Sequence, residues 1–325
     1  MFLGSYPGKN LKVLGAIAGL MLQFQPPGFG QKVVNTSLGS MVYYTPIGSP
    51  WRVATANEEL PSLVFLHNFG GGASAYEWSK VYPAFAPTHR IIAPDLIGWG
   101  QSAHPIRDYQ VSDYLSTLGE FISQVADSPV TVVASSLTGA LTIRLAIERP
   151  ELFKALFLVC PSGFDDFGQN AGRRLPLNII RTPFLSSLIY ELGATNDVAV
   201  RNFLVQFLFS KPQRVSAEMV AAYLASAQQP HAEYAALAFL RGDLYFDLPL
   251  YIDQLTVPTV IFWGERAQFT RLDLGKRLAR LNPQAVRGFE VIEDTGILPH
   301  LEQPAVFIGL LERYLRLIEV GGNSD

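Results

Sequence analysis

The strongest constraint on the fold is the alternation of short apolar runs with longer stretches of helical spacing. The apolar run Leu63–Leu66 breaks into a glycine loop, and amphipathic stretches such as residues 112–126 and 139–153 separate runs of this kind. Continuous apolar strands that alternate with helices are typical of a mostly parallel sheet covered on both faces. We therefore predict an α/β fold. Its strands are expected within residues 30–48, 62–72, 90–102, 130–136, 155–163, 258–265 and 288–294.

Residues 164–250 break this alternation. They contain no clear strand, and their apolar residues recur at helical spacing. An insertion of this length is too long for an ordinary connection between two strands. We predict that residues 164–250 form a helical cap on a core made of residues 35–163 and 251–325, preceded by a separate N-terminal segment, residues 1–34.

The N-terminal segment leaves three interpretations open. Two lysines precede an apolar run over residues 13–24, and Pro26 and Pro27 follow it. The run is too short for an ordinary transmembrane helix but matches the core of a signal peptide, although no small-x-small cleavage site follows. It is a buried or amphipathic helix, an anchor on a membrane surface, or a cleaved signal. The single cysteine, Cys160, fits a reducing compartment, so we expect a cytoplasmic protein, with membrane association as the alternative.

Composition narrows the class of protein further. The chain is 49% hydrophobic, 16% charged and carries a net charge of −3, which is enough apolar sequence for a large core and gives no electrostatic footprint for nucleic acid. None of the five histidines is paired at metal-ligand spacing, and neither a dinucleotide-binding nor a phosphate-loop motif is present. We expect no cofactor, no metal and no nucleic-acid partner. These features do not predict the oligomeric state.

Five motifs follow one another in an order that is informative as a set. They are HNFGGG, PDLIGWGQS, VVASSLTGA, VPTVIFWGE and DTGILPHLEQP, with the helical insertion between the third and the fourth. In this order they resemble the α/β-hydrolase superfamily, in its cap-bearing branch of esterases, epoxide hydrolases, dehalogenases and carbon–carbon bond hydrolases. The resemblance covers about residues 35–317 and implies a sheet with a nucleophile at the end of a central strand.

The resemblance places the nucleophile at Ser136. The family writes G-x-S-x-G at a sharp strand-to-helix turn, where small neighbours allow the chain to bend. Here Ala134 and Thr138 stand in the two glycine positions, and Gly139 follows at once. Thr138 is β-branched and is expected to crowd the turn. A serine that merely caps a helix is the alternative for an isolated motif, but the ordered set of motifs favours the nucleophile position.

The resemblance also implies two backbone donors that stabilise an anion. The first is the N–H of Leu137, directly after Ser136, and the second is the N–H of Phe69 in the glycine loop. Backbone donors do not depend on side-chain identity, so this site survives if Asn68 adopts the conformation that glycine has in the family. His67 is expected to brace the loop.

The acid and the base of the family are missing from their usual places. The family writes W-G-x-x-D, and the position of the aspartate is Ala267 in this chain. It writes G-H-x-P-H-L-E-x-P near the C-terminus, where Ile297 stands in place of the catalytic histidine and His300 matches the second histidine. Neither alanine nor isoleucine accepts a proton, and a serine hydroxyl is a weak nucleophile without an adjacent base.

His300 is the one substitute base in the correct loop, although a shift of three residues is normally too far for the same hydrogen bond. Cys160 is expected to be a core residue. Several carboxylates near the expected site are interpreted as solvated loop charges rather than as acids of a triad: Asp165, Asp166, Glu265, Glu293 and Asp294.

Two functions remain in competition. The first is a hydrolase-fold protein without catalytic activity, or with very weak activity, that binds a small apolar molecule or a partner. The second is an active serine hydrolase, similar to an esterase for hydrophobic esters, that uses Ser136 with a non-standard base such as His300. The loss of both the acid and the base favours the first.

Overall fold

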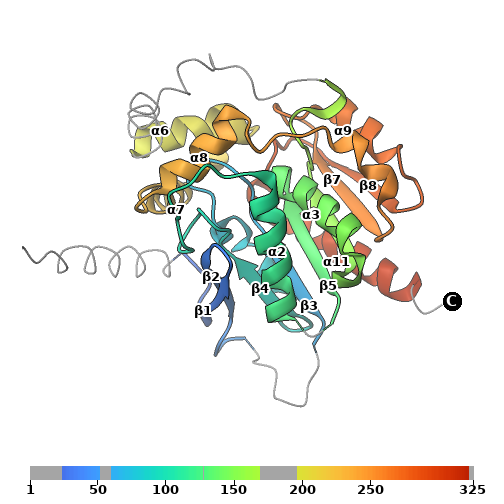
Figure 1. Cartoon of the computed structure of the whole chain (residues 1–325), viewed down its shortest axis with the longest axis horizontal. Helices are drawn as coiled ribbons and strands as arrows, with labels where there is room; N and C mark the ends of the chain where they lie inside the picture. The colour runs from blue at the N-terminus through green and yellow to red at the C-terminus, as the bar shows by residue number, and fades with distance from the viewer. Residues whose placement is uncertain (1–23, 52–59, 127, 169–195, 322–325) are drawn as a thin grey trace, which may run out of the picture.

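The structure is a computed structural model, and it describes residues 24–51, 60–126, 128–168 and 196–321. Its centre is an eight-stranded sheet with the order β1-β2-β4-β3-β5-β6-β7-β8 (Figure 1). The strands are β1 (Phe29–Thr36), β2 (Gly39–Pro46), β3 (Ser62–Leu66), β4 (Arg90–Pro94), β5 (Val130–Ser135), β6 (Phe153–Val159), β7 (Thr259–Gly264) and β8 (Val286–Ile292).

The sheet is antiparallel only at its first edge. Strand β2 pairs antiparallel with β1 and β4, and every later neighbour pair is parallel. All residues of β3, β5 and β7 are buried, because both faces of the parallel part are covered. The prediction of a mostly parallel α/β sheet is confirmed.

Helices cover the two faces of the sheet. On β7, the Phe262 ring lies 5.1 Å from that of Phe307 in α11, whereas the neighbouring Trp263 packs against Gly275 of α9. Since successive side chains of a strand point to opposite faces, α9 and α11 lie on opposite sides. Figure 1 shows α2 and α3 in front of the sheet and α11 behind it. The bounds are α2 (Val111–Val125), α3 (Ser136–Glu148), α9 (Leu272–Ala279), α10 (Pro299–Glu302) and α11 (Pro304–Gly321).

Between β6 and β7 the described part of the chain is helical. It contains α6 (Asp197–Phe203), a π-helical turn (Leu204–Leu208), α7 (Ala217–Ala227) and α8 (Ala232–Arg241). Ser226 of α7 donates to the carbonyl of Ala73 and accepts from the N–H of Gly100, so α7 rests on loops that follow β3 and β4. The boundaries of a cap at residues 164–250 stay a prediction, and residues 169–195 lie outside the described residues.

Short 3₁₀ turns connect the larger elements. They are Ala75–Trp78, Tyr82–Phe85, Pro150–Leu152, Asp166–Gly168, Pro212–Arg214, Leu248–Leu250 and Ile252–Gln254. Most of the predicted N-terminal segment, residues 1–23, lies outside the described residues, and β1 begins within the remainder. No helix in the described part of the chain has both the length and the apolar character needed to span a membrane.

Candidate active site

Ser136 lies at the junction of β5 and α3. Its φ is +55°, a left-handed value that is uncommon for a residue with a side chain, while Ser135 before it is extended. A non-glycine residue is held in this conformation only when its surroundings over-determine it. The structure therefore gives Ser136 the strained turn that the resemblance implies, with the residue almost completely buried at 3% exposure.

Thr138 fits the turn without crowding it. Its side chain is buried, and its hydroxyl donates to the carbonyl oxygen of His67 at 2.6 Å. The close approach occurs one residue later, because a Cβ on Gly139 would lie 3.3 Å from the Cβ of Pro161. The β-branched residue thus ties α3 to the loop after β3, and Gly139 supplies the space that the turn requires.

The two predicted anion donors are buried and unused. Leu137 is 0% and Phe69 is 4% exposed, and neither backbone N–H donates to an acceptor within the described residues. Asn68, which lies between β3 and Phe69, does not adopt a positive φ. The position therefore does not require glycine. Its N–H donates to Glu77 at 2.9 Å, and Tyr223 of α7 donates to the other oxygen of that carboxylate at 2.7 Å.

His67 braces the loop, as expected from the resemblance. The N–H of Leu96 donates to its Nε2 at 3.0 Å, so its Nδ1 carries the proton and donates to the carbonyl of Asn68 at 2.7 Å. Burial lowers the pKa of His67 to about 4, which keeps the ring neutral. Both ring nitrogens are occupied, and the ring is therefore a structural support of the loop.

The loops that carry the predicted acid and base positions lie side by side. The N–H of Arg266 donates to the carbonyl of Thr295 at 2.8 Å, and a Cβ on Gly264 would lie 1.7 Å from the carbonyl oxygen of Gly296. Ala267 is 7% and Ile297 is 2% exposed. The two loops are thus brought together, and Ala267 and Ile297 are both apolar and buried.

His300 lies in α10 and is stacked on Trp78. The two ring centroids are 3.8 Å apart at an interplanar angle of 15°, and the Phe307 ring meets the imidazole edge-on at 5.8 Å. Both ring nitrogens are buried and find no hydrogen-bond partner among the described residues. Burial lowers the pKa of His300 to about 3, so the ring is neutral and packs as an apolar group.

The Ser136 hydroxyl has no histidine as a hydrogen-bond partner within the described residues. All five histidines lie in the described part of the chain, and none forms a hydrogen bond with the Ser136 hydroxyl. Carboxylates of the described residues do not bond to it either. Those residues also contain no group of three or more histidine, cysteine, aspartate or glutamate side chains that could hold a metal ion.

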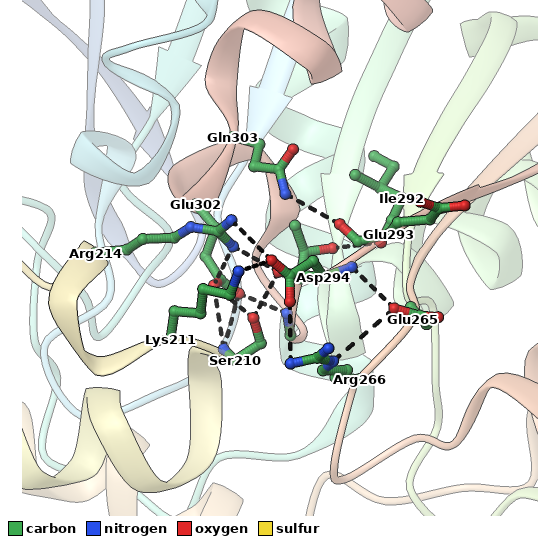
Figure 2. A network of polar contacts seen from close by, with 12 residues as sticks. Ser210, Lys211, Arg214, Glu265, Arg266, Ile292, Glu293, Asp294, Glu302 and Gln303 are labelled. Carbon is green, nitrogen blue, oxygen red and sulfur yellow. Dashed lines mark hydrogen bonds and ion pairs between the residues drawn. The ribbon is translucent and has the colours of Figure 1, made fainter.

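A polar network joins the predicted base loop to the helical insertion (Figure 2). The side chain of Glu302 is 0% exposed and accepts from the N–H of Gly296, from the N–H and hydroxyl of Ser210 at 3.0 Å each, and from Arg214 at 3.0 Å. Asp294 bonds to Lys211 from the same segment. The network fixes the loop that precedes Ile297.

Backbone contacts reinforce this junction. The N–H of Ile297 donates to the carbonyl of Leu208 at 3.1 Å, and a Cβ on Gly296 would lie 2.4 Å from that same oxygen. Asp294, interpreted from the sequence as a solvated charge, instead has a left-handed φ of +59° and pairs with Arg266 at 3.0 Å as well. Asp294 is thus a partly exposed loop charge on which cationic side chains converge.

Asp166 is a buried carboxylate that the sequence interpretation treated as solvated. It accepts from the Ser162 hydroxyl at 2.6 Å, from the N–H of Gly163 at 3.1 Å and from the N–H of Leu248 at 3.0 Å. Burial raises its pKa to about 6. It therefore joins the chain leaving β6 to the chain returning toward β7. Cys160 is buried, as expected of a core residue, and burial raises the pKa of its thiol to about 12.

Sequence reasoning did not find the roles of Glu302, Glu77 and Asp166. Glu302 stands in the HLEQP motif, which was the available signal, but its partners come from a distant helical segment. Glu77 and Asp166 have no motif of their own. Their roles depend on contacts that only the folded chain makes.

Comparisons with known proteins agree with the fold. The sequence model of the alpha/beta hydrolase family matches residues 63–310. An uncharacterized protein of Mycobacterium tuberculosis is 26% identical over 274 residues, which cover 80% of this chain and 76% of that protein. The uncharacterized hydrolase YugF of Bacillus subtilis is 26% identical over 272 residues, covering 82% and 91% of the two chains.

Solved structures show the same fold at lower sequence identity. The carboxylesterase CesB of Bacillus subtilis superposes with a TM-score of 0.70 at 16% identity, covering 94% of this chain and 97% of its own. At this identity the likeness describes the fold, and the chemistry has to be argued from the residues of this chain.

Proposed function

The chain belongs to the α/β-hydrolase family, and on this premise we propose that it is a catalytically silent member that binds a small apolar molecule between its sheet and the helices that follow β6. The proposal separates two parts of the site. The strained turn and its backbone donors are retained, and the side chains that would move the proton of Ser136 are absent.

One observation carries the proposal: among the described residues, no histidine or carboxylate forms a hydrogen bond with the Ser136 hydroxyl. Ile297 and Ala267 fill the two positions from which relatives with a triad would deliver an imidazole and a carboxylate. His300 is engaged in its stack with Trp78, and moving it would leave that buried site unfilled. A hydroxyl of high pKa without an adjacent base is a poor nucleophile.

The apolar character of the ligand is supported by aromatic rings from both sides of the site. Phe69, next to the anion donors, lies 6.3 Å from Phe239 of α8, and Phe164 meets Phe239 edge-on at 5.3 Å. Phe164 also lies 6.2 Å from Phe269, which stacks with Phe207 at 5.6 Å. A molecule bound among these rings would gain mainly from apolar contact.

A second candidate function is that of an active serine hydrolase with a non-standard base. The observation that favours it is the retained strain at Ser136 together with the unused N–H groups of Leu137 and Phe69, a combination suited to an acyl intermediate. Relatives named as hydrolases and a carboxylesterase of the same fold make a hydrophobic ester the first substrate to test.

Labelling with a fluorophosphonate decides between the two. The probe reports a base-activated serine, and general-base assistance contributes about 10²- to 10⁴-fold in rate. We expect the chain to stay unlabelled under conditions that saturate an ordinary esterase. Native mass spectrometry of the purified protein should instead detect a co-purifying apolar compound, and adding that compound should raise the melting temperature.

Rapid labelling that disappears in Ser136→Ala would overturn the silent function and favour the active hydrolase. In that case His300→Phe should also abolish labelling, because His300 is the one imidazole in the correct loop. Labelling that survives His300→Phe would direct the search for the base to a carboxylate.

A further inference from the structure

A groove at the last edge of the sheet lies apart from the Ser136 site. It is formed by α9 and β8, which lie side by side in Figure 1. The groove encloses about 390 Å³, within the size range of small-molecule sites. Its lining residues are Lys276, Ala279, Arg280, Pro283, Val286, Arg287, Gly288 and Phe289. Ser136 stands at the end of β5, three strands away in the sheet order.

The cations of the groove come from two neighbouring elements, α9 and β8. Lys276 and Arg280 are four residues apart, at and just beyond the last turn of α9, and so share one side of the helix. Arg287 and Phe289 both belong to β8, and both line the groove. Phe289 stacks on Trp263 with centroids 6.1 Å apart, which fixes the apolar floor between the charges.

The three cations have no acidic partner. The lining contains no carboxylate, and within the described residues Lys276, Arg280 and Arg287 form no ion pair. Neighbouring charged residues, in contrast, form ion pairs. Arg271 pairs with Asp273 at 3.0 Å, and Glu290 of β8 forms an ion pair with Arg313 of α11.

Stabilisation of the α9 C-terminus accounts for only part of this arrangement. Cations near the end of a helix interact favourably with its dipole, which explains Lys276 and Arg280. It does not explain Arg287, which is on the neighbouring strand and still lines the same groove. Three exposed cations beside a half-buried aromatic ring form a surface to which an anion with an apolar group is complementary.

We propose that the α9–β8 groove binds a phosphate monoester that carries a flat apolar group. The two guanidinium groups would bind the phosphate oxygens by paired, charge-assisted hydrogen bonds, with Lys276 as a third positive charge. The apolar group would lie against the Phe289 ring. The phosphate monoester belongs either to a free small molecule that carries the flat group or to a lipid headgroup, whose glycerol ester would lie against Phe289 instead. Both present the same phosphate oxygens to the guanidinium groups.

Calorimetric titration with phenyl phosphate tests the free ligand. We expect saturable binding that weakens as salt is added, and inorganic phosphate should bind less tightly because it lacks the ring. Arg280→Ala and Arg287→Ala should each weaken phenyl phosphate binding about tenfold, the effect of one charge-assisted hydrogen bond. Phe289→Leu should reduce the difference in affinity between phenyl phosphate and inorganic phosphate.

Lys32→Ala is the matched control, because Lys32 is an exposed cation on β1 at the opposite edge of the sheet. It should leave binding unchanged, as should Ser136→Ala. Melting curves of each variant show that a loss of binding is not a loss of folding, and the amide signal of Gly288 in NMR spectra should shift during the titration.

Vesicles of phosphatidylcholine with and without phosphatidic acid test the lipid source. Binding only to vesicles that contain phosphatidic acid, lost in Arg280→Ala/Arg287→Ala, would support a headgroup as the ligand when phenyl phosphate does not bind. The proposal is overturned if neither ligand binds, or if the double variant binds both as well as the parent chain does. Fluorophosphonate labelling tests Ser136 and does not depend on the groove. A failure of the groove proposal can therefore be distinguished from a failure of the proposed function.

Discussion

The turn at Ser136 and the loops that carry Ala267 and Ile297 are the two parts of the proposed site, and they differ in the groups that they present. At the turn, the left-handed Ser136, the unused N–H groups and the bond from Thr138 to His67 preserve a backbone arrangement suited to an acyl intermediate. At the facing loops, which carry Ala267 and Ile297, the two side chains are apolar and buried. The backbone geometry of the site and its capacity for proton transfer can therefore be tested separately.

The facing loops also use their polar groups differently. Glu302 and Asp294 bond to Ser210, Lys211 and Arg214 of the helical insertion. The turn is bonded to the loop after β3 through His67, and α7 of the helical insertion reaches the same loop through Tyr223 and Glu77. The inserted helices thus contact both parts of the site, but through different polar groups.

Restoring the missing side chains is the strongest test of this comparison. In Ala267→Asp/Ile297→His, the carboxylate, imidazole and hydroxyl should return to the relation of a catalytic triad, since the loops already lie together. We expect fluorophosphonate labelling to rise by about 10²- to 10⁴-fold, the contribution of a general base. The rate of labelling of the double variant, compared with that of the parent chain, measures this increase.

The same double substitution in a Ser136→Ala background should not be labelled. A crystal structure of the double variant would show whether the new imidazole reaches the Ser136 hydroxyl. An imidazole that points away from Ser136 would contradict the positions given to the acid and the base.

Removal of Glu302 should produce the largest loss of stability. Glu302→Ala leaves Arg214 and the N–H groups of Gly296 and Ser210 without their acceptor, and breaking a buried charge pair costs about 3–5 kcal/mol. Urea unfolding measures the change. Glu312→Ala is the control, because that carboxylate is exposed and pairs only with Arg316, and its effect should be within about 0.5 kcal/mol. Equal effects of the two would contradict a structural role for the network.

Sequence patterns predicted the parts of the molecule that depend on local chemistry. Apolar runs such as Leu63–Leu66 gave buried strands because parallel strands are covered on both faces. The motif around Ser136 gave the turn, since its small residues and its strand-to-helix context are local. The expected crowding at Thr138 did not occur, because its hydroxyl finds an acceptor in a different loop. The stack of His300 on Trp78 joins residues too distant in sequence to form a pattern.

Buried titratable groups on the two sides of the site give opposite dependences on pH. On the side of the facing loops, burial holds the pKa of His300 at about 3, below its ordinary 6.5. The unfolded chain therefore binds a proton first, and stability falls as pH falls from about 6.5 toward 3. In His300→Phe this loss should be absent. The free energy of unfolding, parent minus variant, should fall by on the order of 2–3 kcal/mol between pH 7 and pH 4. A difference that does not change with pH would contradict a buried neutral His300.

On the side of the turn, Glu77 should show the reverse, smaller trend. Burial raises its pKa to about 7 from an ordinary 4.5, so the folded chain holds the proton more tightly than the unfolded chain. Its contribution to stability is complete below pH 4.5 and is lost as pH rises through 7. Glu77→Gln removes the titration and keeps the shape of the side chain between Asn68 and Tyr223. The difference in the free energy of unfolding between the parent chain and Glu77→Gln should fall by about 2 kcal/mol from pH 4.5 to pH 6. The corresponding difference between the parent chain and His300→Phe should rise over the same interval. Since other buried acids titrate in this range, only the comparison with the variant isolates Glu77. A Glu77 difference that rises with pH, as the His300 difference does, would contradict a Glu77 that holds its proton more tightly in the folded chain.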